Sequence, residues 1–151
     1  MNVLLDTNIL GRMAEPGHAQ YHIALDATAA LIRRGDQPCI APQVLYEFWV
    51  VATRPKAVNG LGLTVAMAAA ELSRLQRLFL FVPETPAVFA EWEQLVTAHQ
   101  VSGKNAHDAR LVAIMSLHGI SHILTFNSVH FARYRSVTAL EPAVVISAAS
   151  P

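Results

Sequence analysis

Apolar residues follow two patterns along the chain, one typical of buried strands and the other of amphipathic helices. Short apolar runs predict strands at residues 2–5, 39–41, 79–82 and 122–125, and a final edge strand at 136–140. Apolar residues three or four positions apart predict helices over residues 18–34, 42–54, 61–77, 86–98 and 106–118. Strands and helices therefore alternate, with a polar turn expected after the first strand.

Proline and glycine coincide with several of these boundaries. Gly35 and Gly119 stand where two helices are expected to stop, because a left-handed residue after a helix favours glycine. Pro42 suits the first turn of a helix that Pro55 ends. Residues 56–62 then form a glycine-containing loop, and the chain shows no internal repeat or linker.

This alternation predicts an α/β fold with three layers, α/β/α, around a mostly parallel central sheet with right-handed crossovers. The length of 151 residues suits one domain with a sizeable core. We expect a single domain over residues 1–151, with the tail after about residue 146 peripheral. Ligands of such sheets bind outside the carboxyl ends of the strands, where Asp6, the helix start at Pro42 and Asn127 are expected.

The amino-acid composition limits which partners and which cellular compartment we expect for this protein. The formal net charge is zero and 15% of residues are charged, so no strongly basic surface captures a polyanion at long range, and any nucleic-acid contact must be local. The single cysteine, Cys39, cannot form an internal disulfide, which fits a reducing cytoplasm. We interpret it as a buried, inert thiol. No stretch approaches 18 uninterrupted apolar residues, so we expect a soluble, cytoplasmic protein without a signal peptide or membrane span.

Two of the eleven acidic residues stand out near the first two strands. Asp6 directly follows a buried strand; because burying a lone carboxylate is costly, it needs a partner, or it caps a helix that starts at Thr7. Glu47 is the only charged residue between Pro42 and Thr53, and its helical neighbours are apolar. The alternative for Glu47 is a place at the border of the apolar stripe, with its head in water.

A third acid, Asp108, lies on the same helical face as a stripe of apolar residues, which points its carboxylate toward the core. The alternative is a capping-box acid three residues after Asn105. One cause, carboxylates gathered around a hard divalent cation, explains all three acids more economically than three separate exceptions. Oxygen ligands without a cysteine and histidine cluster favour Mg²⁺ or Mn²⁺ over Zn²⁺.

Four motifs, taken in order, resemble those of PIN-domain ribonucleases. They are VLLDTNIL at the start, APQVLYEFW around Glu47, NAHDARLVA around Asp108 and LTFNSVHF near the end. More narrowly, the chain is similar to the VapC-type toxins of bacterial and archaeal toxin–antitoxin operons. Each motif is short, but together they are fairly specific and cover nearly the whole chain.

The resemblance implies a metal-dependent endoribonuclease that acts as the toxin of a toxin–antitoxin pair and hydrolyses RNA phosphodiester bonds. The implied ligands of Mg²⁺ or Mn²⁺ are Asp6, Glu47 and Asp108. Thr7 and Asn8 would support the first of these carboxylates. A metal-activated water would attack the phosphorus in line while the cation neutralises developing charge.

Asn127 takes the fourth position of the site, where many family members carry an aspartate. Its carbonyl oxygen offers a ligand without charge, so we expect one tightly held ion and a second recruited with the RNA phosphate. The alternative function is a catalytically weak or inactive PIN-like domain that binds RNA or a partner. A phosphoryl-transfer enzyme with Asp6 as nucleophile fits less well, since the haloacid-dehalogenase type needs an aspartate where Asn8 stands.

The expected partners are RNA, an antitoxin protein and a second copy of the chain. Pairs of arginines are available for flanking phosphates or are ordinary solvated charges: Arg33 and Arg34, Arg74 and Arg77, and Arg133 and Arg135. Lys104, His107 and His130 are further phosphate contacts or structural residues. The resemblance implies that the second and fourth helical regions line an antitoxin groove and contribute to a homodimer, and the small-residue face of the helix at 63–78 suits close approach.

Overall fold

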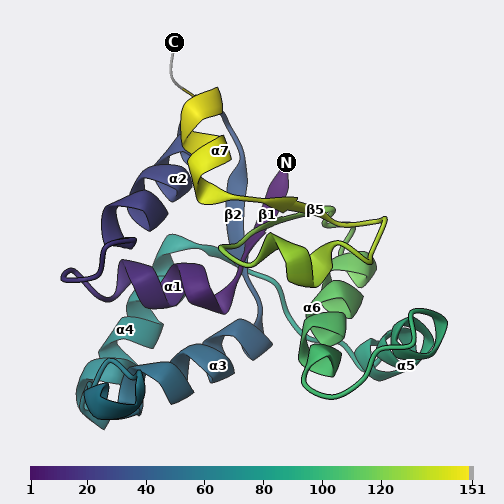
Figure 1. Cartoon of the computed structure of the whole chain (residues 1–151), viewed down its shortest axis with the longest axis horizontal. Coiled ribbons are helices and arrows are strands. Elements are labelled where there is room, and N and C mark those ends of the chain that lie inside the picture. Colours follow the sequence, from purple (N-terminus) through teal and green to yellow (C-terminus); the bar gives the residue numbers. More distant parts are fainter. Residues whose placement is uncertain (150–151) are drawn as a thin grey trace.

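A five-stranded sheet forms the centre of the molecule (Figure 1). The structure is a computed structural model that describes residues 1–149, so residues 150 and 151 of the expected tail lie outside it. The strands are β1 (Asn2–Leu5), β2 (Gln37–Ile40), β3 (Leu80–Phe81), β4 (His122–Leu124) and β5 (Thr138–Leu140). All neighbouring strands are parallel, in the order β3-β2-β1-β4-β5, which confirms the predicted α/β class.

The first strand lies in the middle of the sheet, which explains its continuous apolar run. The side chains of Val3, Leu4 and Leu5 are fully buried, as expected of a parallel strand that is covered on both faces. Leu4 lies opposite Cys39 of β2 on one side and Ile123 of β4 on the other. β1 therefore delivers the residue that follows it, Asp6, to the centre of the carboxyl edge.

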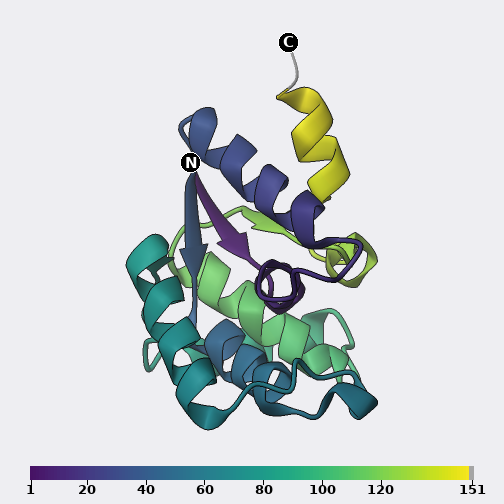
Figure 2. The ribbon, with the colours of Figure 1, turned by 90° about the vertical axis from the view of Figure 1, so that its left-hand side faces the viewer.

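Helices cover the sheet on both sides. They are α1 (Thr7–Met13), α2 (Tyr21–Arg33), α3 (Pro42–Thr53), α4 (Val65–Leu78), α5 (Val88–Ala98), α6 (Asn105–Leu117) and α7 (Pro142–Ala148), with short 3₁₀ helices η1 (Lys56–Val58) and η2 (Ser128–Phe131). Figure 2 shows α2 and α7 on one side of the sheet and α6 on the other, which gives the three layers. α5 packs against α6, and α4 packs against α3.

Two helices lie where the apolar pattern shows no helical repeat, although a helix that starts at Thr7 was the alternative for Asp6. α1 replaces the expected polar turn after β1, and it buries Ile9 and Leu10. α7 begins with Pro142, soon after the predicted edge strand, overlaps the start of the expected tail and packs against α2 with Val145 buried. Each of these helices has only seven residues, too few for a clear helical repeat of apolar positions.

Two further features concern membrane-spanning helices and the single cysteine. Among residues 1–149, no helix is long and apolar enough to cross a membrane. Cys39 is buried in β2, and this burial raises the pKa of its thiol to about 12, so the group is a poor nucleophile.

Candidate active site

The strand order creates a crevice at the carboxyl edge of the sheet. From β1 the chain proceeds to β2 and β3 on one side, and it then returns to place β4 on the other side of β1. Ligands of open parallel sheets bind at such a reversal, beyond the ends of the two strands concerned. Asp6 follows β1 and Thr125 follows β4, so these two residues stand directly at the reversal.

The carboxylate of Asp6 is held by three donors. Its Oδ1 accepts the backbone N–H of Thr7 at 2.7 Å. Its Oδ2 accepts the hydroxyl of Thr125 at 2.6 Å and the side-chain amide of Asn8 at 2.8 Å. Asp6 is therefore the N-cap of α1, as the helix-cap alternative proposed. Its second oxygen also accepts the hydroxyl of Thr125, which follows the neighbouring strand β4.

Burial and neighbouring acids shift Asp6 toward its neutral form. The residue is only 9% exposed, and burial is the largest cause of its raised pKa. The hydrogen bonds from Thr125 and Thr7 oppose this rise, whereas the charges of Glu47 and Asp108 add to it. The three acids that the sequence singled out are thus close enough to interact electrostatically.

Glu47 projects from α3, and each of its carboxylate oxygens accepts a hydrogen bond. The hydroxyl of Thr7 donates to Oε2 at 2.6 Å, and the amide of Gln43 donates to Oε1 at 2.9 Å. The side chain is half-buried. Thr7 thus touches both acids, since its backbone binds Asp6 and its hydroxyl binds Glu47.

Asp108 lies in the first turn of α6, half-buried, with its Oδ2 at 3.3 Å from Nδ1 of His130. Burial raises the pKa of Asp108, the charge of Glu47 raises it further, and His130 and His107 lower it. α6 begins at Asn105, so this residue is not the cap, and the capping-box alternative does not hold.

Asn8, predicted to support Asp6, and Asn127, predicted to take the fourth position of the site, differ in how closely they contact the acids. Asn8 binds Asp6 and Thr125 through its amide nitrogen, and its carbonyl accepts the backbone N–H of Phe126 at 3.1 Å. Asn127 is exposed at the rim, where its backbone N–H donates to the Thr125 hydroxyl at 2.9 Å. The position of Asn8 ties α1 to the end of β4, whereas the Asn127 side chain faces solvent.

Sequence analysis missed two buried polar residues. Thr125 is fully buried, and its hydroxyl joins the ends of β1 and β4. Gln43, 4% exposed, donates through one amide nitrogen to Glu47 and to the backbone carbonyl of His107 at 2.8 Å. Arg110 donates to the Gln43 carbonyl at 3.0 Å. A polar residue just after a buried strand, or in the first turn of the next helix, was the available signal for both.

Two of the predicted arginine pairs contain an arginine that forms an ion pair with a nearby acid. Arg34 pairs with Asp36, which also binds the N-terminal amine, so this arginine lies at the opposite, amino edge of the strands. The first arginine pair is therefore not placed to contact RNA at the acids. Arg74 is engaged by Glu71 on its own helix.

The donor set suits a hard divalent cation, although the side chains are not drawn together around one. Its members are carboxylates with an amide oxygen at the rim, and burial, together with the charges of neighbouring acids, raises the pKa of Asp6 and Asp108. Within the described part of the chain, however, no three histidine, cysteine, aspartate or glutamate side chains are grouped closely enough to hold a metal ion. The residues fit a cation by chemistry, and binding requires the carboxylates to converge.

The protein is thus an all-parallel α/β domain whose interacting carboxylates lie at the strand reversal. The PIN domain family matches residues 3–137, and the chain belongs to that family. Comparison with curated proteins gives no match.

Several solved structures share the fold. VapBC2 from Rickettsia felis, bound to a DNA fragment from its promoter, has a TM-score of 0.69 at 15% identity and covers 93% of this chain and 98% of its own. VapC20 from Mycobacterium tuberculosis, a toxin that cleaves the sarcin-ricin loop, has a TM-score of 0.62 at 20% identity, with coverages of 87% and 95%. A toxin–antitoxin complex from Klebsiella pneumoniae has a TM-score of 0.61 at 21% identity, with coverages of 93% and 97%.

Proposed function

We propose that the protein is a metal-dependent endoribonuclease, the toxin of a toxin–antitoxin pair in the cytoplasm, and that it hydrolyses RNA phosphodiester bonds. The observation that carries this proposal is the buried carboxylate of Asp6 at the strand reversal, with the charges of Glu47 and Asp108 near enough to raise its pKa. Repelling acids in one crevice are costly for the fold and useful for binding a cation. Membership of the PIN family and the toxin structures that share the fold support the same activity.

In this proposal Asp6, Glu47 and Asp108 hold Mg²⁺ or Mn²⁺. The bound cation supplies positive charge for the scissile phosphate and lowers the pKa of water. Thr7 fixes Asp6 and Glu47 relative to each other. This link keeps two of the carboxylates close together, which limits the movement needed for the acids to converge on the cation.

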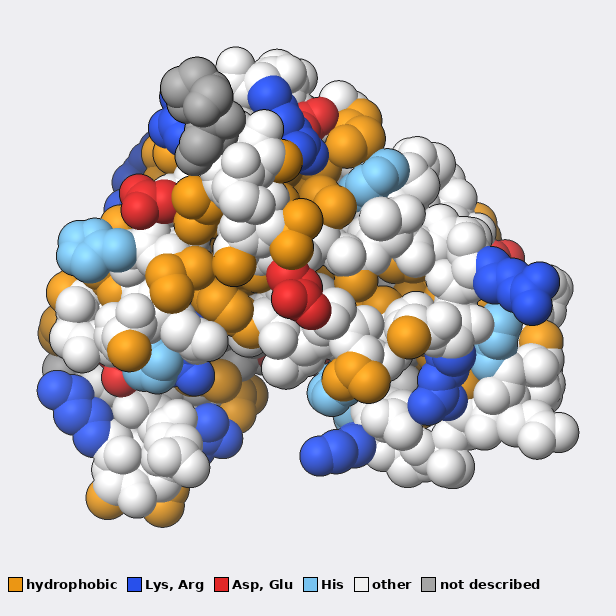
Figure 3. Space-filling view, turned by 45° about the horizontal axis from the view of Figure 1, so that its top comes forward, with side chains coloured by type: hydrophobic (Ala, Val, Ile, Leu, Met, Phe, Trp, Pro, Cys, Tyr) orange, Lys and Arg blue, Asp and Glu red, His pale blue; other side chains and the backbone are white. Residues whose placement is uncertain are grey.

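RNA would reach the acids through a hollow in the surface. Figure 3 shows the molecule hollowed between the part that carries α3 and α4 and the part that carries α5 and α6, with lysine and arginine side chains on both sides. Arg133 and Arg135 follow η2, which carries His130, so they remain candidates for flanking phosphates. This local basic character is compatible with a net charge of zero.

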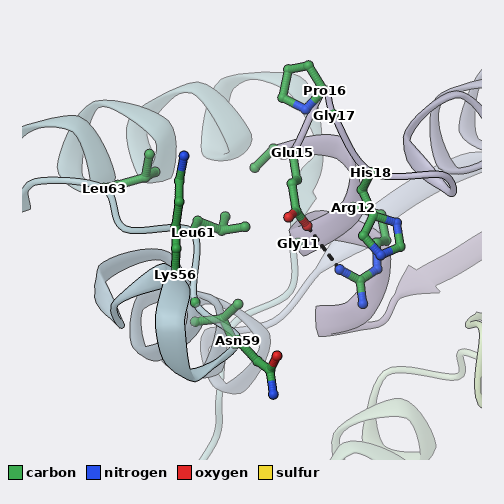
Figure 4. Close-up of a pocket in the computed structure, with 13 residues that line it drawn as sticks. Gly11, Arg12, Glu15, Pro16, Gly17, His18, Lys56, Asn59, Leu61 and Leu63 are labelled. Carbon is green, nitrogen blue, oxygen red and sulfur yellow. Dashed lines mark hydrogen bonds and ion pairs between the residues drawn. The ribbon is translucent and has the colours of Figure 1, made fainter.

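An antitoxin segment would occupy a separate groove. A cavity of roughly 630 Å³ lies between the loop after α1 and the segment that contains η1, and its wall includes Arg12, Glu15, Lys56 and Leu63 (Figure 4). A second cavity shares Leu63 with it and continues along α4. The mixed polar and apolar lining suits an amphipathic segment of a partner.

A second copy of the chain would cover an apolar face of α3 and β3. Tyr46, Val50 and Leu80 are 63%, 58% and 44% exposed there, and β3 is an edge strand. Exposed apolar side chains at a sheet edge favour association. Light scattering of the purified protein would report a dimer, which Tyr46→Asp would convert to a monomer.

RNA cleavage tests the main proposal. Wild-type protein with Mn²⁺ should cut single-stranded RNA, whereas Asp6→Asn and Asp108→Asn should not. Asp26→Asn is the matched control, because Asp26 is an exposed acid on α2. Full activity in either site variant would overturn the mechanism.

Thermal melting separates the proposal from the alternative of a domain that binds RNA or a partner without cutting it. That alternative is favoured by the uncharged, exposed Asn127. A nuclease with this site should melt at a higher temperature in Mn²⁺ than in chelator, because a ligand of the folded state stabilises it. RNA binding without cleavage and without this shift would support the non-catalytic domain.

A further inference from the structure

A small cavity beside the acidic crevice has the properties of a site for a flat, polar-edged ring. It measures roughly 420 Å³ and lies between α5 and the first turn of α6. Its apolar wall includes Phe89 and Trp92, and its polar wall includes Glu84, His107 and Arg110. None of these residues belongs to the acidic cluster.

The aromatic wall is held in place and open to solvent. The indole N–H of Trp92 donates to the backbone carbonyl of Ala106 at 2.9 Å, which fixes the ring against α6. The rings of Phe89 and Trp92 lie 5.6 Å apart at 39°. Phe89 is 66% exposed, although a phenyl ring in water is unfavourable unless something covers it.

The polar wall presents a fixed guanidinium whose charge is balanced. Arg110 donates to the Gln43 carbonyl at 3.0 Å and pairs with Glu84. These partners hold its planar group without removing it from solvent, since its side chain remains 31% exposed. The paired charges make the cavity a poor trap for a bare phosphate, and they offer both a donor and an acceptor to the edge of a heterocycle.

The cavity is joined to the acids by a short chain of hydrogen bonds. The amide of Gln43 accepts from Arg110 and donates to Glu47, so only one side chain separates the polar wall from the acidic cluster. His107 and Arg110 also flank Asp108 on α6. A polymer bound across the acids would therefore bring its neighbouring unit to this cavity.

We propose that this cavity is a nucleobase subsite, which receives an unpaired base of the RNA next to the scissile phosphate. The base stacks against Phe89, and its edge meets Glu84 and Arg110. Unstacked bases of single-stranded RNA are recognised by such aromatic and guanidinium faces together with hydrogen bonds to their edges. The subsite rests on the proposed ribonuclease function and adds a contact with the base to the contacts with phosphate.

Nucleotide binding tests the subsite without requiring cleavage. The chain has two tryptophans, so Trp49→Phe leaves Trp92 as the only indole reporter. In the Asp6→Asn background and without metal, titration with each of the four nucleoside monophosphates should quench Trp92 fluorescence saturably. Inorganic phosphate should not quench it.

Substitution of the stacking ring provides the second arm. Phe89→Ala and Phe89→Leu should each weaken nucleotide binding about tenfold, since stacking on an aromatic ring is lost in both. Tyr21→Ala, which removes a half-buried aromatic on α2, should leave binding unchanged. In the active protein, Phe89→Ala should raise KM for RNA and redistribute the cleavage positions.

The outcomes separate the two proposals. Absence of saturable quenching, equal quenching by phosphate, or equal loss of binding in Tyr21→Ala would overturn the subsite even if the protein cleaves RNA. A change from dimer to monomer in Phe89→Ala would also overturn it, because the ring would then belong to a subunit interface. Saturable binding by a protein that does not cut RNA would uphold the base site and overturn the nuclease.

Discussion

The hydroxyl of Thr125 donates to the carboxylate of Asp6 at 2.6 Å and joins residues 119 positions apart in the sequence. The two residues follow adjacent parallel strands, β1 and β4, at the point where the strand order reverses. The same hydroxyl accepts the amide of Asn8 and the backbone N–H of Asn127. Thr125 therefore links the end of β4 to the acidic site, together with Asn8.

Replacement of Thr125 by valine removes this hydroxyl with little change in volume. We expect Thr125→Val to lower the free energy of unfolding by about 1–3 kcal/mol, because buried polar partners lose a hydrogen bond. The pKa of Asp6 should rise further, since the Thr125 hydrogen bond lowers it. Chemical denaturation measures the first effect. Thr97→Val is the control, because the Thr97 hydroxyl bonds only carbonyls of its own helix.

Gln43 is a positioning residue for Glu47, and its removal should act on cation binding. Gln43→Met keeps the length of the side chain but removes its hydrogen bonds to Glu47, His107 and Arg110. We expect Mn²⁺ affinity, measured by calorimetry, to fall about 10- to 100-fold, as when other groups that orient metal ligands are lost. Gln76→Met, on α4, should bind Mn²⁺ like the wild type; equal affinity in both variants would remove Gln43 from the site.

The raised pKa of Asp108 predicts how stability depends on pH. A carboxyl whose pKa is higher in the fold than in the unfolded chain stabilises the fold below the unfolded value of 3.8, and this contribution is lost as pH rises through the folded pKa. In chelator at pH 7, Asp108→Asn should therefore melt at a higher temperature than the wild type. The difference should shrink as pH falls toward 4. A variant that melts lower at pH 7 would contradict the view that burial and the charge of Glu47 make the ionised Asp108 unfavourable in the fold.

A negative charge at residue 127 should strengthen cation binding. Asn127→Asp places a fourth carboxylate at the rim, and we expect about tenfold tighter Mn²⁺ binding with a lower melting temperature in chelator, because one more like charge joins the cluster. Asn127→Ala separates the effect of added charge from that of the lost amide. If the aspartate variant binds Mn²⁺ no better than the alanine variant, the residue lies outside the cation site.

Gly60 is the glycine for which the structure leaves no room. A Cβ there would stand 1.8 Å from the backbone carbonyl oxygen of Arg54, so the turn must move to accept alanine. We expect Gly60→Ala to destabilise the fold by about 3 kcal/mol. Gly17→Ala, where nothing lies within 4 Å of the added carbon, should leave the unfolding midpoint unchanged.

The regular parts of the fold could be predicted because their patterns are long or apolar. The run after Met1 identified β1, and the 12 residues between Pro42 and Thr53 gave α3 almost to the residue. The short helices α1 and α7 could not be found in this way, since seven residues give about two helical turns. Their formation depends on packing against α2 and, for α1, on the cap that Asp6 provides.

The acids of the site, with Thr7 and Asn8 beside the first of them, could be selected from the sequence, but Thr125 and Gln43 could not. Each of the three carboxylates stood out against apolar neighbours, and their resemblance to a family motif joined them. Thr125 and Gln43 are uncharged and carry no periodic signal. Their importance arises only from the strand order and from the approach of α3 to α6, which are properties of the assembled chain.

Because Asp6 also caps α1, only some substitutions can remove its charge without destabilising the fold. Alanine there would remove the charge and also the acceptor at the start of α1, at a cost of about 0.5–2 kcal/mol. Asparagine caps a helix about as well as aspartate, so it would extinguish the charge and leave that helix start intact. Under the proposed nuclease function, descendants of this chain that lose catalysis while keeping the fold are therefore expected to carry asparagine at residue 6, and an inert form for trapping uncut RNA is best made by the same exchange.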